Sequence, residues 1–412
     1  MQLSRRLLIA AIVGSLFWWA ILNWLGTSYA TIDPRWRDHV SNVFCGYLLK
    51  ERGFEVYSRP TMDFVTLPDL EKAKAFAEAH GLPNKDVVAY DDEGVSRLMV
   101  IITGQVPRPY PPGYYLYHAP ATALVVGGVA TSSQVLNWFA LVALLVAHVS
   151  ALFVVRSLME LKLTQGSRKE SLAGGLLLGL ASTFCYFEFV RWTLNGEYDL
   201  LAVLFLVFSI IAYREKRPTS AIAQFAVSCF IHFRSLTYFP IVLFSARDWF
   251  ERMRSGKPTR KDYALLVFSA ALAIPSAYAL WLNIPALKDA SQYDLNALHF
   301  SKLGPGNWGK TLALFLGGGA ILVTLGLRGQ RLAAACAAWS VLMFMQSRVV
   351  REWYANFFYP LFMLLDDRGS RKNRGNVALV LAWIVLASAL LTSNSPFEFR
   401  LIRELVEALG RL

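Results

Sequence analysis

The sequence predicts an all-α polytopic membrane protein, and three observations support this fold class. Hydrophobic residues make up 55% of the 412 residues and charged residues 17%, whereas soluble domains carry about a quarter charged residues. The mean hydropathy is +0.39. Apolar runs of about 18 residues or more, long enough to cross a bilayer as helices, recur along the chain. We therefore expect one membrane-embedded domain over residues 1–412 with about eleven transmembrane helices.

The formal net charge of +12 fits a membrane topology and does not call for a nucleic-acid partner. Lys and Arg gather in the cytoplasmic loops of membrane proteins, so their positions matter more than their sum. The cysteines have neither metal-binding spacing nor a disulfide framework, and we interpret them as packing residues. They are Cys45, Cys185, Cys229 and Cys336.

The first predicted span covers residues 7–26, and Arg5 and Arg6 before it hold the N-terminus in the cytoplasm. The apolar run is too long for a signal peptide and lacks a small-residue cleavage site. Residues 27–133 are then predicted to form a large first extracytoplasmic loop. This loop contains the longest polar stretch of the chain.

Within this loop, residues 38–52 have helical character and Gly53 is a plausible stop. Residues 61–105 predict a small α/β insertion, with a short helix followed by a strand hairpin around the turn 91–94. Two roles stay open for the insertion. In the first, the insertion recognises an acceptor or a partner. In the second, it is a family-specific insertion without a catalytic role.

Residues 114–130 are apolar, but the charge rule argues against a span there. If they crossed, the basic residues after the next span would be exported, namely Arg156, Lys162, Arg168 and Lys169. We therefore expect an interfacial or re-entrant helix on the outer face.

The remaining spans follow from that choice, and the basic loops between them then fall on the cytoplasmic side. The predicted spans cover residues 134–158, 171–191, 199–213, two short spans within 219–246, 262–284, 310–327, 331–347, 353–366 and 376–393. A C-terminal amphipathic helix is predicted at residues 394–412.

Charged residues also gather on the predicted outer side, at the ends of spans and in the loops. They are Asp33, Asp38, His39, Glu188, Arg191, Glu197, Asp199, His232, Arg234, His299, Lys302, Arg348, Arg351 and Glu352. Guanidinium groups bind phosphate oxygens in a bidentate manner, and a nearby carboxylate is suited to accept a proton from a hydroxyl. This combination is typical of group transfer from a lipid-linked phosphate. The alternative is that the arginines reach toward lipid headgroups without a catalytic role.

Three elements in the first half of the chain occur in a characteristic order. They are Asp38, Gly53-Phe54-Glu55-Val56-Tyr57, and Tyr110-Pro111-Pro112 leading into residues 114–130. In this order and topology the chain resembles the GT-C superfamily of polyprenyl-phosphate-sugar-dependent glycosyltransferases, in its mannosyltransferase-like and aminoarabinose-transferase-like branches. The resemblance covers residues 1–245 by pattern and the rest by span count and charge placement.

The resemblance implies a GT-C-like bundle whose active site faces the outside of a bacterial inner membrane. Asp38 would be the general base, with Asp33 competing for this role, although the spacing to Gly53 favours Asp38. The donor would be a polyprenyl-phosphate-linked sugar, and the acceptor a lipid, a glycan or a protein. The implied substrate-binding residues are Arg234, Arg348, Arg351, Glu197, Asp199, His39, Tyr57, Tyr110, Tyr114 and His299. Glu197 and Asp199 would orient the acceptor or hold a divalent cation, although no metal motif requires one.

Two other function classes remain open on the sequence. A lipid or small-molecule transporter or flippase would show internal repeats and charges at mid-membrane, whereas here the charges gather on one face. A polysaccharide ligase or polymerase would have its large outer loop late in the chain, whereas here the large loop is the first.

Overall fold

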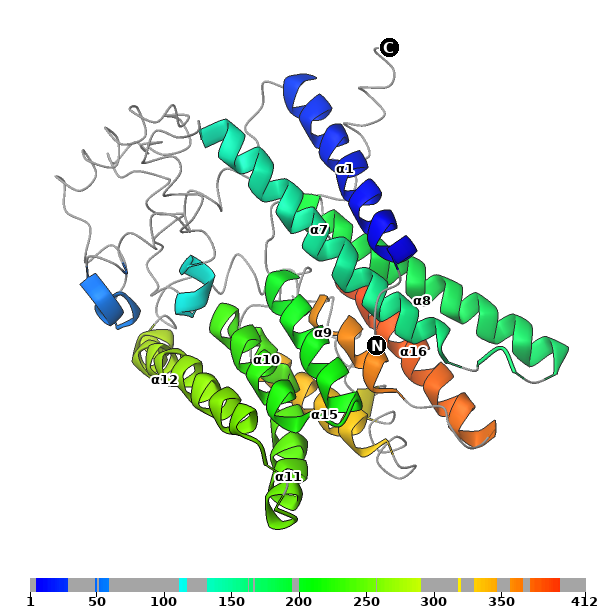
Figure 1. Ribbon diagram of the computed structural model, residues 1–412. Helices are drawn as coiled ribbons and strands as arrows, with labels where there is room; N and C mark the ends of the chain where they lie inside the picture. The colour runs from blue at the N-terminus through cyan, green and yellow to red at the C-terminus, as the bar shows by residue number, and fades with distance from the viewer. Residues whose placement is uncertain are drawn as a thin grey trace.

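The computed structural model describes a helical bundle (Figure 1). The described residues are 5–28, 49, 52–58, 111–116, 132–161, 163–165, 167–194, 200–256, 258–289, 318–319, 330–346, 356–365 and 371–392. In these ranges the regular structure is all-helical, with no strand. The predicted α/β insertion at 61–105, most of the loop at 27–133 and the helix at 394–412 lie outside them.

Among the described residues, three helices are long and apolar enough to cross a membrane. They are α7 (Ser132–Met159), α8 (Arg168–Leu194) and α12 (Arg260–Asp289). Their candidate spans have mean hydropathies of 2.5, 1.5 and 1.9. The length and composition of these helices suggest a membrane protein, and the all-helical structure with candidate spans confirms the coarser part of the predicted fold class. The larger predicted number of spans stays a prediction.

The described part of the chain contains further helices. They are α1 (Arg5–Ser28), α9 (Leu200–Arg214), α10 (Pro218–Ile231), α11 (Pro240–Arg254), α15 (Arg331–Gln346) and α16 (Arg371–Thr392), with the 3₁₀ helices η1 (Gly53–Tyr57), η3 (Phe233–Tyr238) and η7 (Tyr359–Leu364). Helices α9 and α10 have 15 and 14 residues, or about 21–23 Å of helix. A bilayer core is about 30 Å thick.

The predicted span at 353–366 does not have the expected conformation. Its described residues, 356–365, form 3₁₀ turns, and Leu365 is already extended. Pro360 has no backbone N–H and therefore cannot support the i→i−4 ladder of an α-helix here. The aromatic side chains of this segment are instead buried in the core, including Phe357, Phe358 and Tyr359.

Helix α9 is the central element of the bundle. It contacts α7, α10, α11, η3 and η7, and Leu206, Val207 and Ile210 are fully buried. Two serine hydroxyls connect it to the antiparallel α10. Ser209 Oγ donates to the Ala221 carbonyl at 2.8 Å, and Ser228 Oγ donates to the Ala202 carbonyl at 2.6 Å. Such hydroxyl bonds let two apolar helices pack closely where the hydrophobic effect between them is weak.

Capping residues define where α8 and α12 begin. Ser167 and Glu170 bond to each other's backbone N–H at the start of α8. Thr259 and Asp262 do the same at the start of α12. Both pairs are capping boxes, which satisfy the free N–H groups of a first helical turn. Asp262 also accepts a 2.6 Å bond from Thr219 Oγ1, which ties the start of α12 to the start of α10.

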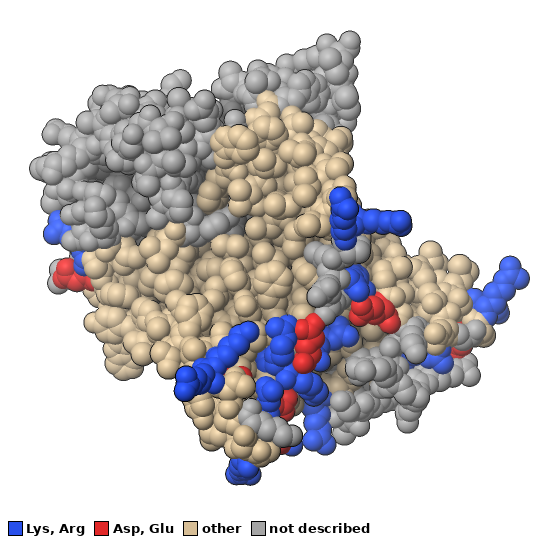
Figure 2. All heavy atoms as spheres, in the orientation of Figure 1, with Lys and Arg blue, Asp and Glu red and all other residues tan. Residues whose placement is uncertain are grey.

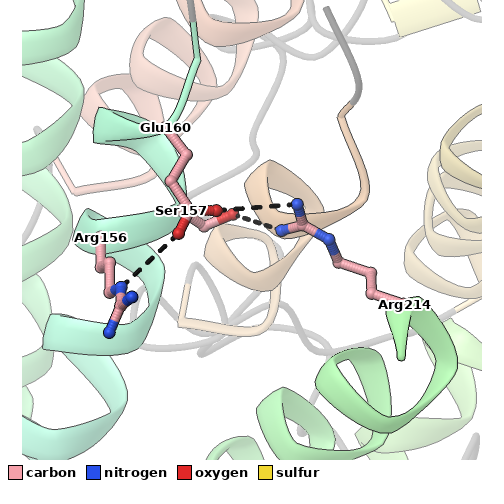
Figure 3. A network of polar contacts seen from close by, with 4 residues as sticks. All are labelled: Arg156, Ser157, Glu160 and Arg214. Carbon is pink, nitrogen blue, oxygen red and sulfur yellow. Dashed lines mark hydrogen bonds and ion pairs between the residues drawn. The ribbon is translucent and has the colours of Figure 1, made fainter. Parts of the chain in front are cut away.

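The basic ends of several helices lie together. Arg214, at the end of α9, donates to Ser157 Oγ at 3.0 Å and lies 3.8 Å from Glu160, at the end of α7 (Figure 3). Arg156 pairs with the same glutamate at 3.5 Å. Arg374, in the first turn of α16, bonds to the Gln165 carbonyl between α7 and α8.

Most of the described Lys and Arg side chains that are visible in Figure 2 follow this end of the bundle, below a broad band almost free of charge. The prediction that the basic loops share one side of the bundle is therefore confirmed for three of these places. They are the C-terminal ends of α7 and α9 and the start of α16. The assignment of that side to the cytoplasm stays a prediction from the charge rule.

The close fit of α8 against the α7–α8 turn gives a test of stability. A Cβ on Gly174 would lie 2.2 Å from the Leu163 carbonyl oxygen, whereas a Cβ on Gly179 of the same helix would meet nothing within 4 Å. We expect Gly174→Ala to lower the free energy of unfolding by about 1–3 kcal/mol through overpacking. Gly179→Ala should be neutral or stabilising by up to about 1 kcal/mol. Thermal unfolding in detergent measures both variants, and equal effects would contradict the packing.

Candidate functional site

Residues 111–116, which include Pro111, Pro112 and Gly113 of the Tyr-Pro-Pro-Gly element, pack against the end of α10. Residues 112–116 form a short helix, in which the Tyr114 N–H donates to the Pro111 carbonyl at 3.1 Å. A Cβ on Gly113 would lie 2.4 Å from both the carbonyl oxygen and the ring of Phe230. Glycine is therefore required for this close backbone approach. The start of the predicted interfacial helix at 114–130 is helical here, and the residues after 116 lie outside the described ranges.

His232 connects this short helix to two other segments. It ends α10 in an extended conformation (φ −150°, ψ 125°), and its Nδ1 accepts a 3.1 Å bond from the Arg234 N–H. Its ring is 6.3 Å from the Tyr114 ring and 5.3 Å from the Phe357 ring, measured between centroids. Because Nδ1 is an acceptor, the proton of the neutral imidazole lies on Nε2. We call Tyr114, His232 and Phe357 the aromatic junction.

Arg234 lies in η3, at the turn between α10 and α11, as the sequence predicted for the tip of a short two-helix hairpin. Its side chain is half-buried. The surrounding backbone is held at two points, because Thr237 Oγ1 donates to the Arg234 carbonyl at 2.7 Å and Ser228 and Ser235 share a 2.6 Å hydroxyl bond. This arrangement holds the backbone of Arg234 beside the aromatic junction.

Tyr238 fixes the far end of η3 to the segment that carries Phe357. Its hydroxyl donates to the Phe357 carbonyl at 2.7 Å, and its side chain is fully buried. The contact joins residues that are 119 positions apart in the sequence. The hairpin tip and residues 356–365 are thus held together by a buried hydrogen bond as well as by ring packing.

Tyr57 is fully buried in η1 and belongs to the same core cluster as Tyr114 and Tyr115. Gly53 has φ +59°, the left-handed conformation expected for a residue that stops a helix. The next residue, Phe54, packs its ring 5.3 Å from that of Tyr278 on α12. The Gly-x-x-x-Tyr element is therefore anchored to the second half of α12.

The sequence analysis placed Glu188 and Arg191 among the outer-side charges, but not among the substrate-binding residues. They form a 3.3 Å ion pair near the end of α8, with side chains 2% and 4% exposed. Phe189, between them, packs 5.6 Å from the ring of Tyr359. Charged groups in an apolar span are costly and are usually paired or functional. The signal in the sequence was two opposite charges three residues apart, which share one helix face.

The aromatic junction lies at the end of the bundle away from the basic loops. Helix α10 begins just after Arg217 and ends at His232, about 21 Å along its axis. Tyr278, which contacts η1, is likewise about 27 Å along α12 from Arg260. In Figure 1 the short helix at 112–116 and η1 both lie away from the ends of α7 and α9 that carry the charges.

The structure places three of the predicted site residues, Tyr57, Tyr114 and Arg234, and packs the last two against His232. The others lie outside the described ranges. They are Asp33, Asp38, His39, Tyr110, Glu197, Asp199, His299, Arg348 and Arg351. Within the described ranges, no group of three His, Cys, Asp or Glu side chains is arranged to hold a metal ion.

Comparisons with protein-family models, curated proteins and solved structures gave no match. The resemblance to the GT-C superfamily therefore stays a prediction from the sequence. A functional assignment has to be made from the residues of this chain.

The Tyr238 hydrogen bond gives a test of how the site is held. Tyr238→Phe leaves the Phe357 carbonyl without this donor, and we expect a loss of about 1–3 kcal/mol in the free energy of unfolding. Tyr263→Phe is the matched control, because Tyr263 is 49% exposed, and it should change stability by less than about 0.5 kcal/mol. Thermal unfolding in detergent compares the two. A control as damaging as Tyr238→Phe would contradict a specific role for this bond.

Proposed function

We propose that the protein is an integral-membrane glycosyltransferase that moves a sugar from a polyprenyl-phosphate donor to an acceptor hydroxyl on the extracytoplasmic face. The observation that carries the proposal is the position of Arg234. The residue is half-buried at a hairpin tip, and its backbone N–H donates to His232 of the aromatic junction, at the end of the bundle away from the basic loops. A phosphate headgroup would bind there while its isoprenoid tail extends along the apolar surface of the bundle.

The chemistry that fits these residues is a single inverting displacement. Asp38 takes the proton of the acceptor hydroxyl, and the hydroxyl oxygen attacks the anomeric carbon. The bond from this carbon to the phosphate oxygen breaks, and the polyprenyl phosphate leaves with the electron pair. Arg234, with Arg348 and Arg351, stabilises the charge that develops on the leaving phosphate. No covalent sugar–enzyme intermediate is needed.

The other predicted site residues would bind and orient the substrates. Tyr57 and Tyr114 are buried aromatic side chains in the cluster next to the hairpin tip and would support the sugar-binding surface. Glu197 and Asp199 would orient the acceptor or hold a divalent cation. Tyr110, His39 and His299 are further candidates for contacts with the sugar. In this proposal the protein resides in a bacterial inner membrane, and the acceptor is a lipid, a glycan or a protein.

The role of Arg234 is tested with polyprenyl phosphate itself, because this lipid is the product whatever the sugar. Arg234→Gln removes a charged donor, and we expect binding roughly 10- to 100-fold weaker. Lys169→Gln, an exposed change near the start of α8, should bind like the unmodified protein. The measurement is a titration of the detergent-solubilised full chain. If Arg234→Gln binds polyprenyl phosphate as tightly as the unmodified protein, the phosphate does not bind at the hairpin tip.

The base is tested by pairing Asp38→Asn with Asp33→Asn. We expect Asp38→Asn to stay in the membrane and to bind polyprenyl phosphate but to abolish sugar transfer, because the amide cannot take the proton. Asp33→Asn should keep most of its activity. Transfer is followed with radiolabelled polyprenyl-phosphate sugars and membrane extracts as acceptors. Full activity in Asp38→Asn with an inactive Asp33→Asn would move the base to Asp33, and full activity in both would contradict the mechanism.

One observation favours a second candidate function, transport of a lipid or small molecule. The Glu188–Arg191 pair is buried within a candidate span, and such pairs also occur on the pathways of transporters. Proteoliposomes distinguish the two functions. Movement of polyprenyl phosphate between leaflets without sugar transfer would favour the transporter. Sugar transfer without such movement would favour the glycosyltransferase.

A further inference from the structure

Helix α11 and the residue before it expose apolar side chains along one face, and arginines lie next to the last of them. Phe239, Leu243, Phe250 and Met253 follow one another at spacings of four, seven and three residues, so they share one face of the helix. Leu243 is 56% exposed, Phe250 52% and Met253 37%. Ile241 and Ser245 are buried on the opposite face. The apolar stripe therefore points away from the bundle and continues to the last turn.

Basic residues surround the end of this stripe. Six basic and two acidic residues lie between Arg247 and Lys261. The exposed members among the described residues are Arg247, Arg252, Arg254, Arg260 and Lys261. Arg247 pairs with Glu251 at 3.1 Å. In the described part of the chain no carboxylate lies within 4.0 Å of the Arg254 or Arg260 guanidinium, so these charges face outward unneutralised.

Aromatic side chains pack together where the end of α11 meets the start of α12. Trp249 packs 5.1 Å from Phe250 on α11 and 6.5 Å from Tyr263 on α12, in the second case nearly perpendicular. Trp and Tyr concentrate where a bilayer meets water, because their rings are amphipathic. Figure 1 shows α11 ending at the bottom of the view, and Figure 2, in the same orientation, shows blue side chains at that end of the molecule, below the tan band.

We propose that the α11–α12 corner, which comprises Phe250, Met253, Arg252, Arg254, Arg260 and Lys261, binds the headgroups of anionic phospholipids. Phe250 and Met253 enter the acyl boundary, as in interfacial amphipathic helices. The guanidinium groups then reach the lipid phosphates, where clustered basic residues next to a span attract anionic lipid. If the corner faced water alone, Phe250 and Met253 would stay exposed to water. The surface of an anionic bilayer accommodates these two apolar side chains as well as the basic residues.

The test uses the detergent-solubilised full chain and fluorescent phosphatidylglycerol, with phosphatidylcholine as the neutral competitor. The variant is Arg252→Gln/Arg254→Gln/Arg260→Gln. Its matched control, Arg168→Gln/Lys169→Gln/Arg331→Gln, removes three exposed charges at the starts of α8 and α15. We expect the preference for phosphatidylglycerol to fall at least tenfold in the variant, since each surface charge contributes roughly fivefold. It should fall less than threefold in the control.

Three results would overturn the proposal. Equal losses in the variant and its control would mean that the whole basic end attracts anionic lipid without a local site. An unchanged preference in the variant would mean that the corner does not bind the headgroup. Displacement of the lipid by inorganic phosphate at the same concentration would mean that a free anion is the ligand. Phe250→Ser/Met253→Ser gives an independent readout, because it should weaken binding of both lipids and keep the preference between them.

Discussion

The ring of His232 contacts two segments that are far from it in the sequence. Tyr114 comes from the short helix at 112–116 and Phe357 from the 3₁₀ segment after α15, and each packs against the imidazole. The same imidazole accepts the backbone N–H of Arg234, so the backbone of the turn that carries Arg234 depends on the ring. If His232 moved, both packing contacts and the turn that carries Arg234 would change together. The proposed phosphate site therefore rests on this one buried side chain.

A second constraint separates the two ends of the bundle. Charged groups are costly within an apolar layer, and the contacts between the ends of α7 and α9 gather several arginines at one side. Helix α10 runs from that side to His232. The aromatic junction is therefore distant from the basic loops, and the short helix at 112–116 packs against it instead. The proposed site for a lipid phosphate would use Arg234 at this end of the bundle, next to buried aromatic side chains.

The long apolar helices could be predicted from the sequence to within a few residues. The spans expected at 134–158 and 262–284 correspond to α7 and α12, because an uninterrupted apolar run leaves few alternatives for the backbone in a membrane. The conformation of residues 356–365 could not be predicted, because an apolar segment with one proline is compatible with a span until its packing is known. The close approach of Gly113 to Phe230 depends on tertiary packing, which no local pattern reports. The spacing of Glu188 and Arg191 predicts that they share one helix face, but the burial of their ion pair could not be predicted from the sequence.

The aromatic junction is tested most directly by a double-mutant cycle on Tyr114 and His232. The free energies of unfolding of Tyr114→Ala, His232→Ala and the double variant would be measured in the same detergent. If the rings pack as described, the two changes should be coupled by about 0.5–1.5 kcal/mol. Effects that add to within about 0.3 kcal/mol would contradict the contact, and with it the placement of Arg234 beside the Tyr-Pro-Pro-Gly helix.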